Sequence, residues 1–400
     1  MRETDIAIVG GGLAGATAAA MLGRAGVRAV LVDPHAAYPP DFRCEKLDAS
    51  QVELLRKTGL AEAVLRAATP DGQVSIVRYG RLVDRRPNSQ YDIFYDTLVN
   101  TIRAKIPDSI EVLGAKARVV STGPDRQKVA LSTGEEISAR LVVMANGLNS
   151  ALRQTMGMTR RDISKCHSIS IGFDLIPVGR PSFDFRALTY YPASPADRLA
   201  YLTLFPIGAT MRANCFVYRD FDDPWLRQLR EAPLKTLAQA MPGLLELTGK
   251  FEVRGFIKIR PVDLYVTEGH RQHGIVLVGD AFATSCPAAG TGANKVFTDV
   301  ERLCKEYIPQ WLLTPGMGVE KVSAFYDDPA KQASDRDSAW KAMYLRSLSI
   351  DTALQWRARR AAKFVLQLGL GKLRRMSHLI STRPAYPDRP ARAGGGSSVR

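Results

Sequence analysis

The sequence predicts an α/β fold: a nucleotide-binding domain, interrupted by a mostly antiparallel β-sheet and followed by a basic helical segment. Three observations support this prediction. A strand–glycine–helix–strand unit opens the chain over residues 5–33, and strand-like segments dominate between residues 166 and 269. A buried strand then returns at residues 275–278 and leads into a second glycine-rich turn.

The opening unit has the spacing of the dinucleotide-binding fingerprint. Residues 6–9 form a short branched run typical of a buried parallel strand, and Gly10, Gly12 and Gly15 follow it. We expect Gly10 to make the turn into the helix. Gly12 would let backbone N–H groups approach a pyrophosphate, and Gly15 would let the helix pack on the strand.

The residues next to these glycines complete a phosphate-binding turn. Leu13 and Ala14 lie in the first turn of the helix, where free N–H groups and the helix dipole favour a phosphate. The next strand, residues 27–32, ends at Asp33, which is placed to accept hydrogen bonds from ribose hydroxyls. Together these features predict a bound dinucleotide.

The composition is that of an ordinary globular protein, with 46% hydrophobic and 24% charged residues among 400. No apolar run approaches the roughly 20 residues that span a bilayer, and the first strand begins too early for a signal peptide. The five cysteines are odd in number and scattered, which indicates neither a disulfide framework nor a metal site. We therefore expect a cytoplasmic protein.

The remaining elements follow in order along the chain. Helices are predicted over residues 49–58, 61–68, 91–106 and 225–240, with a single strand at 74–83 and a turn at 85–88. Further strands are predicted over residues 116–121, 127–132, 136–137, 141–144, 168–175, 187–191, 200–205 and 212–218.

The second glycine-rich turn is the strongest signal after the fingerprint. Its fixed positions are Gly279, Asp280, Pro287, Gly290, Gly292, Ala293 and Asn294. With the fingerprint, this motif resembles the flavin-dependent aromatic hydroxylases, the family of para-hydroxybenzoate hydroxylase and the ubiquinone-biosynthesis hydroxylases. The resemblance covers most of residues 1–330 and implies a glutathione-reductase-type FAD-binding Rossmann domain.

The resemblance implies roles for these residues in binding FAD. Asp280 stands at a strand end, where its carboxylate can hold the ribityl chain. Gly290 and Gly292 let backbone N–H groups approach the flavin ring, and the helix that follows favours negative charge on that ring. Arg43 matches an arginine of the family that packs near the adenine-side phosphates or the ribose.

The sequence departs from the family at three positions near the flavin and the nicotinamide. A segment from Ala145 to Arg153 resembles one that the family ties to NAD(P)H use, but Asn146 replaces its acid. Ala283 replaces the histidine that follows the Gly-Asp pair, and Tyr95 replaces an arginine. NAD(P)H remains the expected reductant, and these departures predict slow reduction of the flavin when no substrate is bound.

The resemblance and the change of pattern divide the chain into domains. Residues 1–73, 91–165 and 270–335 are expected to form the FAD-binding domain, and residues 74–90 and 166–269 a sheet-rich substrate domain. A basic helical segment over residues 336–383 follows. Residues 384–400, rich in Pro, Gly, Ser and Arg, are expected to be disordered.

The expected function is FAD-dependent monooxygenation of a small apolar or aromatic substrate, through a flavin C4a-hydroperoxide as the resemblance implies. No side chain is required as a nucleophile, so we assign no catalytic residue. A flavin-dependent reductase of isoprenoid or lipid double bonds, similar to the geranylgeranyl reductases, is the alternative. A non-catalytic escort protein on the same scaffold is a further alternative, opposed by the retained glycines, Asp33 and Asp280.

The net charge of +15 is concentrated at the C-terminus, where residues 341–400 hold thirteen Lys or Arg and two Asp, a net of +11. Residues 350–370 predict an amphipathic helix. Its apolar stripe would be Leu354, Ala358, Ala361, Val365 and Leu368, with Arg359, Arg360, Lys363 and Gln367 opposite. Such a helix can dock on its own protein, lie peripherally on an anionic inner membrane surface, or bind an acidic carrier protein. No nucleic-acid-reading motif accompanies the charge, so we expect no nucleic acid partner.

Overall fold

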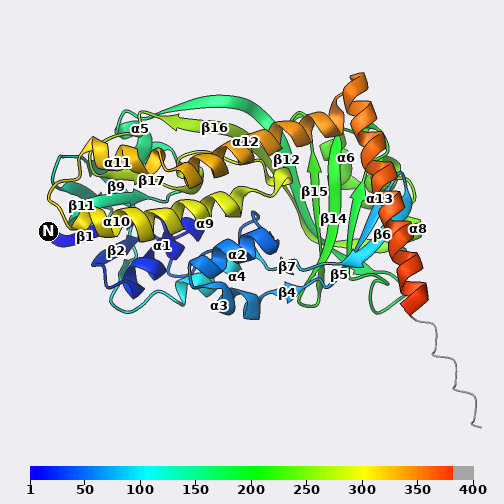
Figure 1. Cartoon of the computed structure of the whole chain (residues 1–400), viewed down its shortest axis with the longest axis horizontal. Helices are drawn as coiled ribbons and strands as arrows, with labels where there is room; N and C mark the ends of the chain where they lie inside the picture. The colour runs from blue at the N-terminus through cyan, green and yellow to red at the C-terminus, as the bar shows by residue number, and fades with distance from the viewer. Residues whose placement is uncertain (382–400) are drawn as a thin grey trace, which may run out of the picture.

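The computed structural model describes the backbone of residues 1–381 and the side chains of residues 1–374. The predicted disordered tail, residues 384–400, lies outside the described residues. Two lobes, each built on a seven-stranded sheet, lie end to end, and a long helix runs along both (Figure 1).

The first lobe contains a sheet with the strand order β8-β2-β1-β11-β10-β9, in which β17 also pairs with β11. Its parallel centre has β1 (Arg2–Val9) between β2 (Ala29–Val32) and β11 (Glu136–Met144), and β17 (Ile275–Leu277) extends it. β8 (Glu111–Leu113) lies at one edge, and β10 (Gln127–Leu131) joins β11 to β9 (Ala117–Ser121) at the other edge. The two short strands predicted at 136–137 and 141–144 are one continuous strand, because β11 pairs with β1 along its whole length.

Helices cover one face of this sheet, and the other face packs mainly against side chains of β9 and β10. On the helical face, α1 (Leu13–Arg24) and α9 (Gly292–Arg302) pack on the apolar side chains of β1 and β11. The outer layer beside them consists of α2 (Ala49–Lys57), α3 (Ala61–Ala67) and α4 (Tyr95–Arg103). The predicted helix 91–106 is shorter at both ends: α4 ends at Arg103, and it begins only at Tyr95 because Tyr91 and Asp92 form the strand β7. β7 lies between β3 (Lys46–Leu47) and β4 (Thr69–Pro70), and α5 (Ala151–Thr155) and α10 (Ile308–Leu312) complete the lobe.

The second lobe contains a sheet with the strand order β16-β12-β15-β14-β13-β5-β6, which we call the inserted sheet. Its strands are β5 (Gln73–Arg78), β6 (Arg81–Pro87), β12 (Thr159–Pro177), β13 (Ala187–Tyr191), β14 (Leu199–Ile207), β15 (Thr210–Val217) and β16 (Phe251–Glu268). The predicted single strand 74–83 is wrong: β5 and β6 form a hairpin. Tyr79 and Gly80 turn the chain there with positive φ angles of 52° and 70°.

The two faces of the inserted sheet differ in polarity because alternate side chains point to opposite faces. Ile169 and Ile171 of β12 and Cys215 of β15 pack into an apolar cluster. Three helices cover that face: α6 (Pro224–Glu231), α7 (Pro233–Ala240) and α8 (Leu244–Thr248). The predicted helix 225–240 is broken at Pro233, which lacks the N–H that an unbroken helix requires. The opposite face carries Ser170, Arg212 and Asn214 and is turned toward the first lobe.

The chain ends in a group of helices that joins the lobes. α11 (Val319–Tyr326) leads into α12 (Pro329–Ile350), which packs against α9 of the first lobe and β14 of the second (Figure 1). Lys331 of α12 and Asp299 of α9 form a buried ion pair at 2.9 Å. No helix in the described part of the chain is long and apolar enough to cross a membrane.

The last helix, α13 (Leu354–Ser381), packs on β6 at the far end of the molecule. The side chains of Phe364 and Leu368 join the core beneath it, and Gly371 is buried against the backbone of Val83. The predicted apolar stripe therefore does not form one face. Leu368 packs inward, whereas Leu354 and Val365 are exposed, because the packed face is centred on Phe364 and Gly371.

Candidate functional site

Of the three fingerprint glycines in the turn between β1 and α1, only Gly12 has open space beside it. Gly10 has φ +104°, and a Cβ there would lie 2.6 Å from the carbonyl oxygen of Ala145. A Cβ at Gly15 would overlap the carbonyl oxygen of Gly10, so α1 can pack this closely only with glycine. At Gly12 the nearest described atom to a Cβ is Tyr38 Cε2, at 3.7 Å.

The space beside Gly12 suits a phosphate. Gly12 is the N-cap of α1, and no side chain of the described residues caps this end. The first-turn residues Leu13 and Ala14 are buried, so only the backbone N–H groups of this end are available to a ligand. Of the three fingerprint glycines, the packing requires Gly10 and Gly15, whereas Gly12 leaves room for a ligand.

Asp33 lies at the end of β2 and is 7% exposed. Its Oδ2 accepts a hydrogen bond of 2.7 Å from the backbone N–H of Gly11, and its Oδ1 lies 3.1 Å from Arg103 Nη2. The carboxylate therefore fixes the glycine turn, and Arg103 of α4 covers it. The contact of Asp33 with a ribose stays a prediction.

The second motif lies at the same edge of the first sheet. Asp280 lies in the turn that follows β17, and its Oδ2 accepts a hydrogen bond of 3.2 Å from Arg43 Nη1. The preceding residue, Gly279, donates its N–H to Asp299 Oδ2 at 2.9 Å, which anchors the turn to α9. Arg43 and Asp280 are far apart in sequence, and the fold brings them together.

Residues 286–292, here called the flavin loop, connect this turn to α9. Pro287 opens a single helical turn, and Gly290 follows with φ +69°, with no described atom within 4 Å of a Cβ there. The side-chain amide of Gln51 donates to the carbonyl oxygen of Gly290 at 2.7 Å and to Asn294 Oδ1 at 3.0 Å. Gln51 of α2 therefore holds the loop, and Asn294 ties the start of α9 to the same side chain. Gly292 and the buried Ala293 begin α9.

Sequence reasoning missed Gln51. The only signal was its place in a capping box with Asp48, which marks the start of α2 but says nothing of Gly290.

The third motif approaches Asp280 from the other side. Arg153, which is 3% exposed, donates to Asn146 Oδ1 at 3.2 Å and to the carbonyl oxygen of Gly147 at 2.9 Å. Burial lowers the pKa of Arg153. The hydroxyl of Tyr265 lies 3.5 Å from Arg153 Nη2 and donates to the carbonyl oxygen of Asp280 at 3.1 Å. All three sequence motifs thus converge, and Tyr265 of β16 links Arg153 to the turn at Asp280.

Residues 41–45, which we call the strap, connect this site to the inserted sheet. Asp41 accepts hydrogen bonds from Arg43 Nε at 2.7 Å and from Arg260 Nη2 of β16 at 2.5 Å. Burial opposes ionisation of Asp41, but these two guanidinium groups outweigh it and lower its pKa to about 2. The ring of Phe42 packs on Gly172 of β12, where a Cβ would lie 2.5 Å from it.

The strap ends in a buried ion pair. Both carboxylate oxygens of Glu45 accept hydrogen bonds from Arg212 of β15, at 2.9 and 3.0 Å, and Asp174 accepts a third from the same guanidinium at 2.9 Å. The side chains of Glu45 and Arg212 are 1% and 6% exposed. Arg43, which reaches Asp280, is therefore held between two contacts with the inserted sheet.

The polar face of the inserted sheet also reaches the flavin loop. The hydroxyl of Tyr201 donates to the carbonyl oxygen of Ala288 at 2.6 Å. On neighbouring strands, Ser170 Oγ and Asn214 Oδ1 are buried and have no hydrogen-bond partner within the described residues. Tyr190 lies on the opposite face, with its hydroxyl bonded to the carbonyl oxygen of Pro242.

Comparison with known proteins decides the family. The sequence profile of the family described as FAD binding domain matches residues 3–309. The chain belongs to this family. It is 27% identical over 328 residues to 3-demethoxyubiquinol 3-hydroxylase of Escherichia coli (strain K12), covering 76% of this chain and 79% of that protein. It is 25% identical over 399 residues to ubiquinone hydroxylase UbiL of Rhodospirillum rubrum, covering 94% and 88%.

The fold is shared with a solved flavoenzyme. The structure of p-nitrophenol 4-monooxygenase from Pseudomonas putida DLL-E4 superposes with a TM-score of 0.73 at 17% identity, covering 95% of this chain and 98% of that one. The predicted α/β fold and membership of the flavin-dependent aromatic hydroxylases are confirmed. So is the first of the three expected functions, that of an FAD-dependent monooxygenase.

The described residues fit FAD. A pyrophosphate has open space at Gly12, and the flavin loop exposes its backbone at Gly290. Asp280 keeps 32% of its side chain exposed at this edge of the first sheet, beside Arg43.

Proposed function

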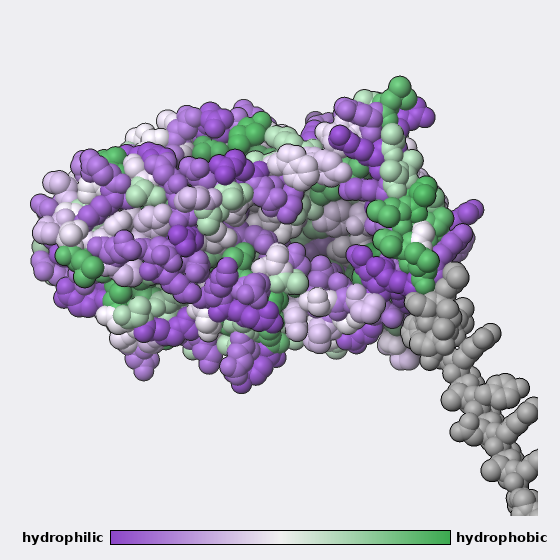
Figure 2. All heavy atoms as spheres, viewed as in Figure 1, coloured by the Kyte–Doolittle hydropathy of each residue, from purple (hydrophilic) through white to green (hydrophobic). Residues whose placement is uncertain are grey.

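We propose that this FAD-dependent monooxygenase hydroxylates a neutral aromatic molecule held between the flavin loop and the polar face of the inserted sheet. The observation that carries this proposal is the hydrogen bond between Tyr201 and Ala288, because it makes that face and the loop two walls of one space. Figure 2 shows the surface hollowed between the two lobes. The relative named for 3-demethoxyubiquinol supports an aromatic substrate.

The charges on the polar face favour a neutral substrate. Arg212 is already bonded to two carboxylates, those of Glu45 and Asp174. A substrate carboxylate would have to displace one of them to reach the guanidinium. Ser170 Oγ and Asn214 Oδ1, in contrast, are buried oxygen atoms that have no partner among residues 1–374, and buried polar groups are stabilised by a hydrogen bond. A phenol or hydroquinone hydroxyl would supply it.

FAD, when bound and reduced, supplies the activation of dioxygen. The chain's own residues bind and orient the cofactor and the substrate, and they exclude water. The N-terminus of α1 receives the pyrophosphate, Asp280 and Arg43 hold the middle of the cofactor, and the strap closes the gap between the lobes. The N-terminus of α9 follows the flavin loop, and its N–H groups would stabilise negative charge on the flavin ring.

We also propose NAD(P)H as the reductant, with slow reduction until substrate binds. Arg153 meets the neutral amide of Asn146 where the family carries a carboxylate, so the charge balance beside Asp280 differs. Stopped-flow reduction tests this proposal. We expect Asn146→Asp to speed NADPH reduction of the substrate-free enzyme, and equal rates in both proteins would contradict it.

We place the enzyme in the cytoplasm, attached peripherally through its basic C-terminal helix to the inner membrane surface or to an acidic carrier protein. The concentration of +11 of the net charge in residues 341–400 supports a partner of negative charge. An apolar aromatic substrate gathers in membranes, which favours the lipid surface.

The test supplies FAD-loaded protein with NADPH and ¹⁸O₂, and compares a methylated hydroquinone, its dimethyl ether and 4-hydroxybenzoate. We expect labelled oxygen in the hydroquinone product, and little product from the ether or the carboxylate. Product without label, or reduction of an isoprenoid double bond under the same conditions, would contradict monooxygenation. Preferred turnover of the carboxylate would contradict the assignment of the polar face.

A further inference from the structure

Helix α13 presents a row of apolar side chains on the side away from the protein. Leu354, Val365, Leu366 and Leu373 are 77%, 66%, 62% and 63% exposed, and Leu370 lies in the same row. We call these five residues the outer face of α13. Figure 2 shows hydrophobic residues gathered along this helix. Four of the five, Val365, Leu366, Leu370 and Leu373, lie close together in the second half of the helix. Single exposed leucines are common on proteins, but such a group on one helix is not.

Contacts on the inner face fix the rotation of α13, so its outer face cannot turn inward. The ring of Phe364 packs edge-on against Tyr79 at 4.8 Å. Gln367 is hydrogen-bonded to Arg78, and Arg374 forms an ion pair with Asp84 of β6. A Cβ at Gly371 would overlap the carbonyl oxygen of Val83, so the helix and the strand are already as close as glycine allows.

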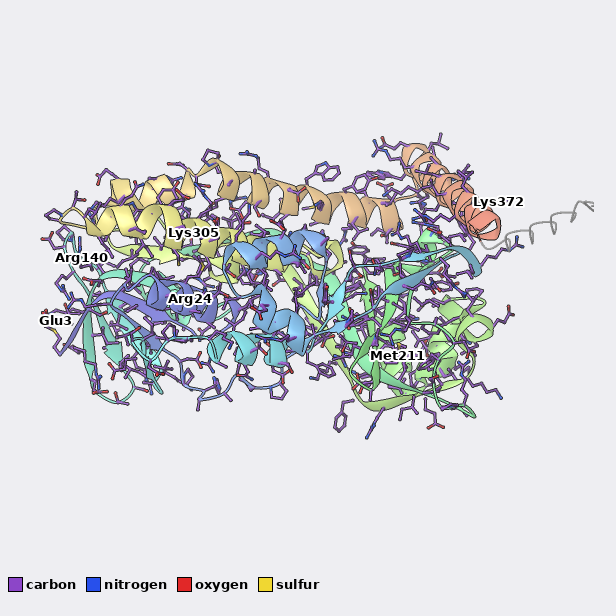
Figure 3. The ribbon with its side chains drawn as sticks, turned by 60° about the horizontal axis from the view of Figure 1, so that its bottom comes forward. Glu3, Arg24, Arg140, Met211, Lys305 and Lys372 are labelled. Atoms are coloured by element: carbon purple, nitrogen blue, oxygen red, sulfur yellow. The ribbon has the colours of Figure 1, made fainter. Side chains whose placement is uncertain are left out.

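The charge of α13 favours a partner of negative charge. Leu354–Ser381 contains seven Lys or Arg and neither Asp nor Glu. Arg359 packs over the ring of Trp356, and Lys372, labelled in Figure 3 at the opposite end of the molecule from Glu3, is exposed. An apolar row bordered by cations is typical of helices that lie in the interface of an anionic membrane.

The same charge disfavours the other occupants of an apolar face. A second copy of this chain would bring seven more cations to the contact, and the two helices would repel each other. The row from Leu354 to Leu373 is about 28 Å long at the helical rise, straight and one helix wide. That shape suits a flat lipid surface.

We propose that the outer face of α13 inserts its apolar side chains shallowly into an anionic membrane surface. This deepens the proposed function, since it names the residues that would bring the enzyme to a membrane-dissolved substrate. Leu366 and Leu373 enter the acyl boundary, and Arg359 and Lys372 meet lipid phosphates. The inner face stays docked on β6, so the rest of the enzyme keeps its structure.

Vesicle flotation of the full-length, FAD-loaded protein tests this proposal. We expect flotation with phosphatidylglycerol vesicles and not with phosphatidylcholine vesicles, and release at high salt. The double variant Leu366→Asp/Leu373→Asp should reduce the floated fraction at least tenfold, and Arg359→Glu/Lys372→Glu should do the same. The matched control is Phe256→Asp, because Phe256 is 93% exposed on β16, away from α13; it should float like the wild type.

Three results would overturn the proposal. They are equal recovery from both vesicle types or from neither, undiminished flotation of the leucine variant, and a dimer in light scattering that the leucine variant abolishes. Binding of poly-glutamate without binding of vesicles would assign the helix to an acidic protein instead. Hydroxylation of a water-soluble hydroquinone without vesicles is measured in parallel. Its retention in a protein that does not float would leave the proposed function standing while the membrane proposal fails.

Discussion

The first sheet and the inserted sheet both border the candidate site, but they contribute different parts of the chain to it. The first sheet offers backbone: the open N–H groups at Gly12 and the exposed turn at Gly290. The inserted sheet offers side chains: Arg212 and Arg260 bond to the strap, and Tyr201 bonds to the flavin loop. Backbone contacts suit a cofactor that every member of the family shares. Side-chain contacts can vary with the substrate, so we propose that the first sheet binds the cofactor and the inserted sheet sets specificity.

The largest effect should follow from blocking the backbone contact. Gly12→Val has space for its side chain and an ordinary φ of −73°, so the protein should fold, but the side chain would occupy the place of the pyrophosphate. We expect FAD affinity to fall more than 100-fold, or about 3 kcal/mol. Fluorescence titration of the apoprotein with FAD measures this loss.

Gly15→Val is the matched contrast, because its Cβ would overlap the backbone of Gly10. This variant should fail to fold, as seen by circular dichroism. If Gly12→Val binds FAD like the wild type, the backbone of the first sheet does not receive the cofactor.

Breaking the strap should have an intermediate effect on both lobes. Arg212→Met leaves Glu45 buried without its cation, which typically costs about 3–5 kcal/mol of unfolding free energy. Because the strap also holds Arg43, FAD affinity should fall about tenfold. Adding Glu45→Gln should recover part of both losses, since the fully buried charge is then removed and only Asp174, which is 30% exposed, lacks its cation.

The control for the strap is Arg219→Met, which removes a guanidinium paired with Asp223 at 3.0 Å within the second lobe. Urea unfolding and FAD titration are measured on all variants. An Arg212→Met protein that is destabilised but binds FAD as tightly as wild type would separate the strap from the cofactor site. The division between the sheets would then be complete.

The sequence predicted what depends on the backbone. Gly10, Gly15 and Gly290 could be predicted because the spacing of glycines marks turns and places where two backbone segments come close together. Arg43 and Asp280 were placed by resemblance to a family. Glu45, Arg212 and Gln51 were missed because each acts through a partner distant in sequence, which no local pattern reveals.

Errors in the predicted elements have the same origin. The strand 74–83 alternates well enough to be read as one piece, and only the packing of Gly80 against the carbonyl oxygen of Pro242 shows where it turns. The stripe on α13 was drawn from hydrophobicity alone. Which residues face inward depends on Tyr79 and Val83 of the hairpin below.

The smallest effect concerns pH and the inserted sheet. His167 of β12 is fully buried against α12, and burial, aided by the charge of Arg346, lowers its pKa to about 4 from an ordinary 6.5. The folded state therefore binds this proton less readily than the unfolded chain. The stability that His167 contributes is complete above pH 6.5 and is lost as the pH falls toward 4. Unfolding free energy should drop by about 2 kcal/mol between pH 7 and pH 5 from this group.

Urea unfolding at the two pH values measures this dependence. His167→Gln should flatten it, while FAD affinity at pH 7 should stay close to that of the wild type. An unchanged pH slope in the variant would show that other groups carry the titration.

The absorption spectrum of the purified chain during titration with FAD, read for wild type and Gly12→Val side by side, tests whether the backbone of the first sheet binds FAD. We expect a yellow wild-type protein that saturates with FAD at one molecule per chain, and a folded Gly12→Val protein that takes up almost none. A folded wild-type protein that stays colourless throughout the titration would contradict this expectation.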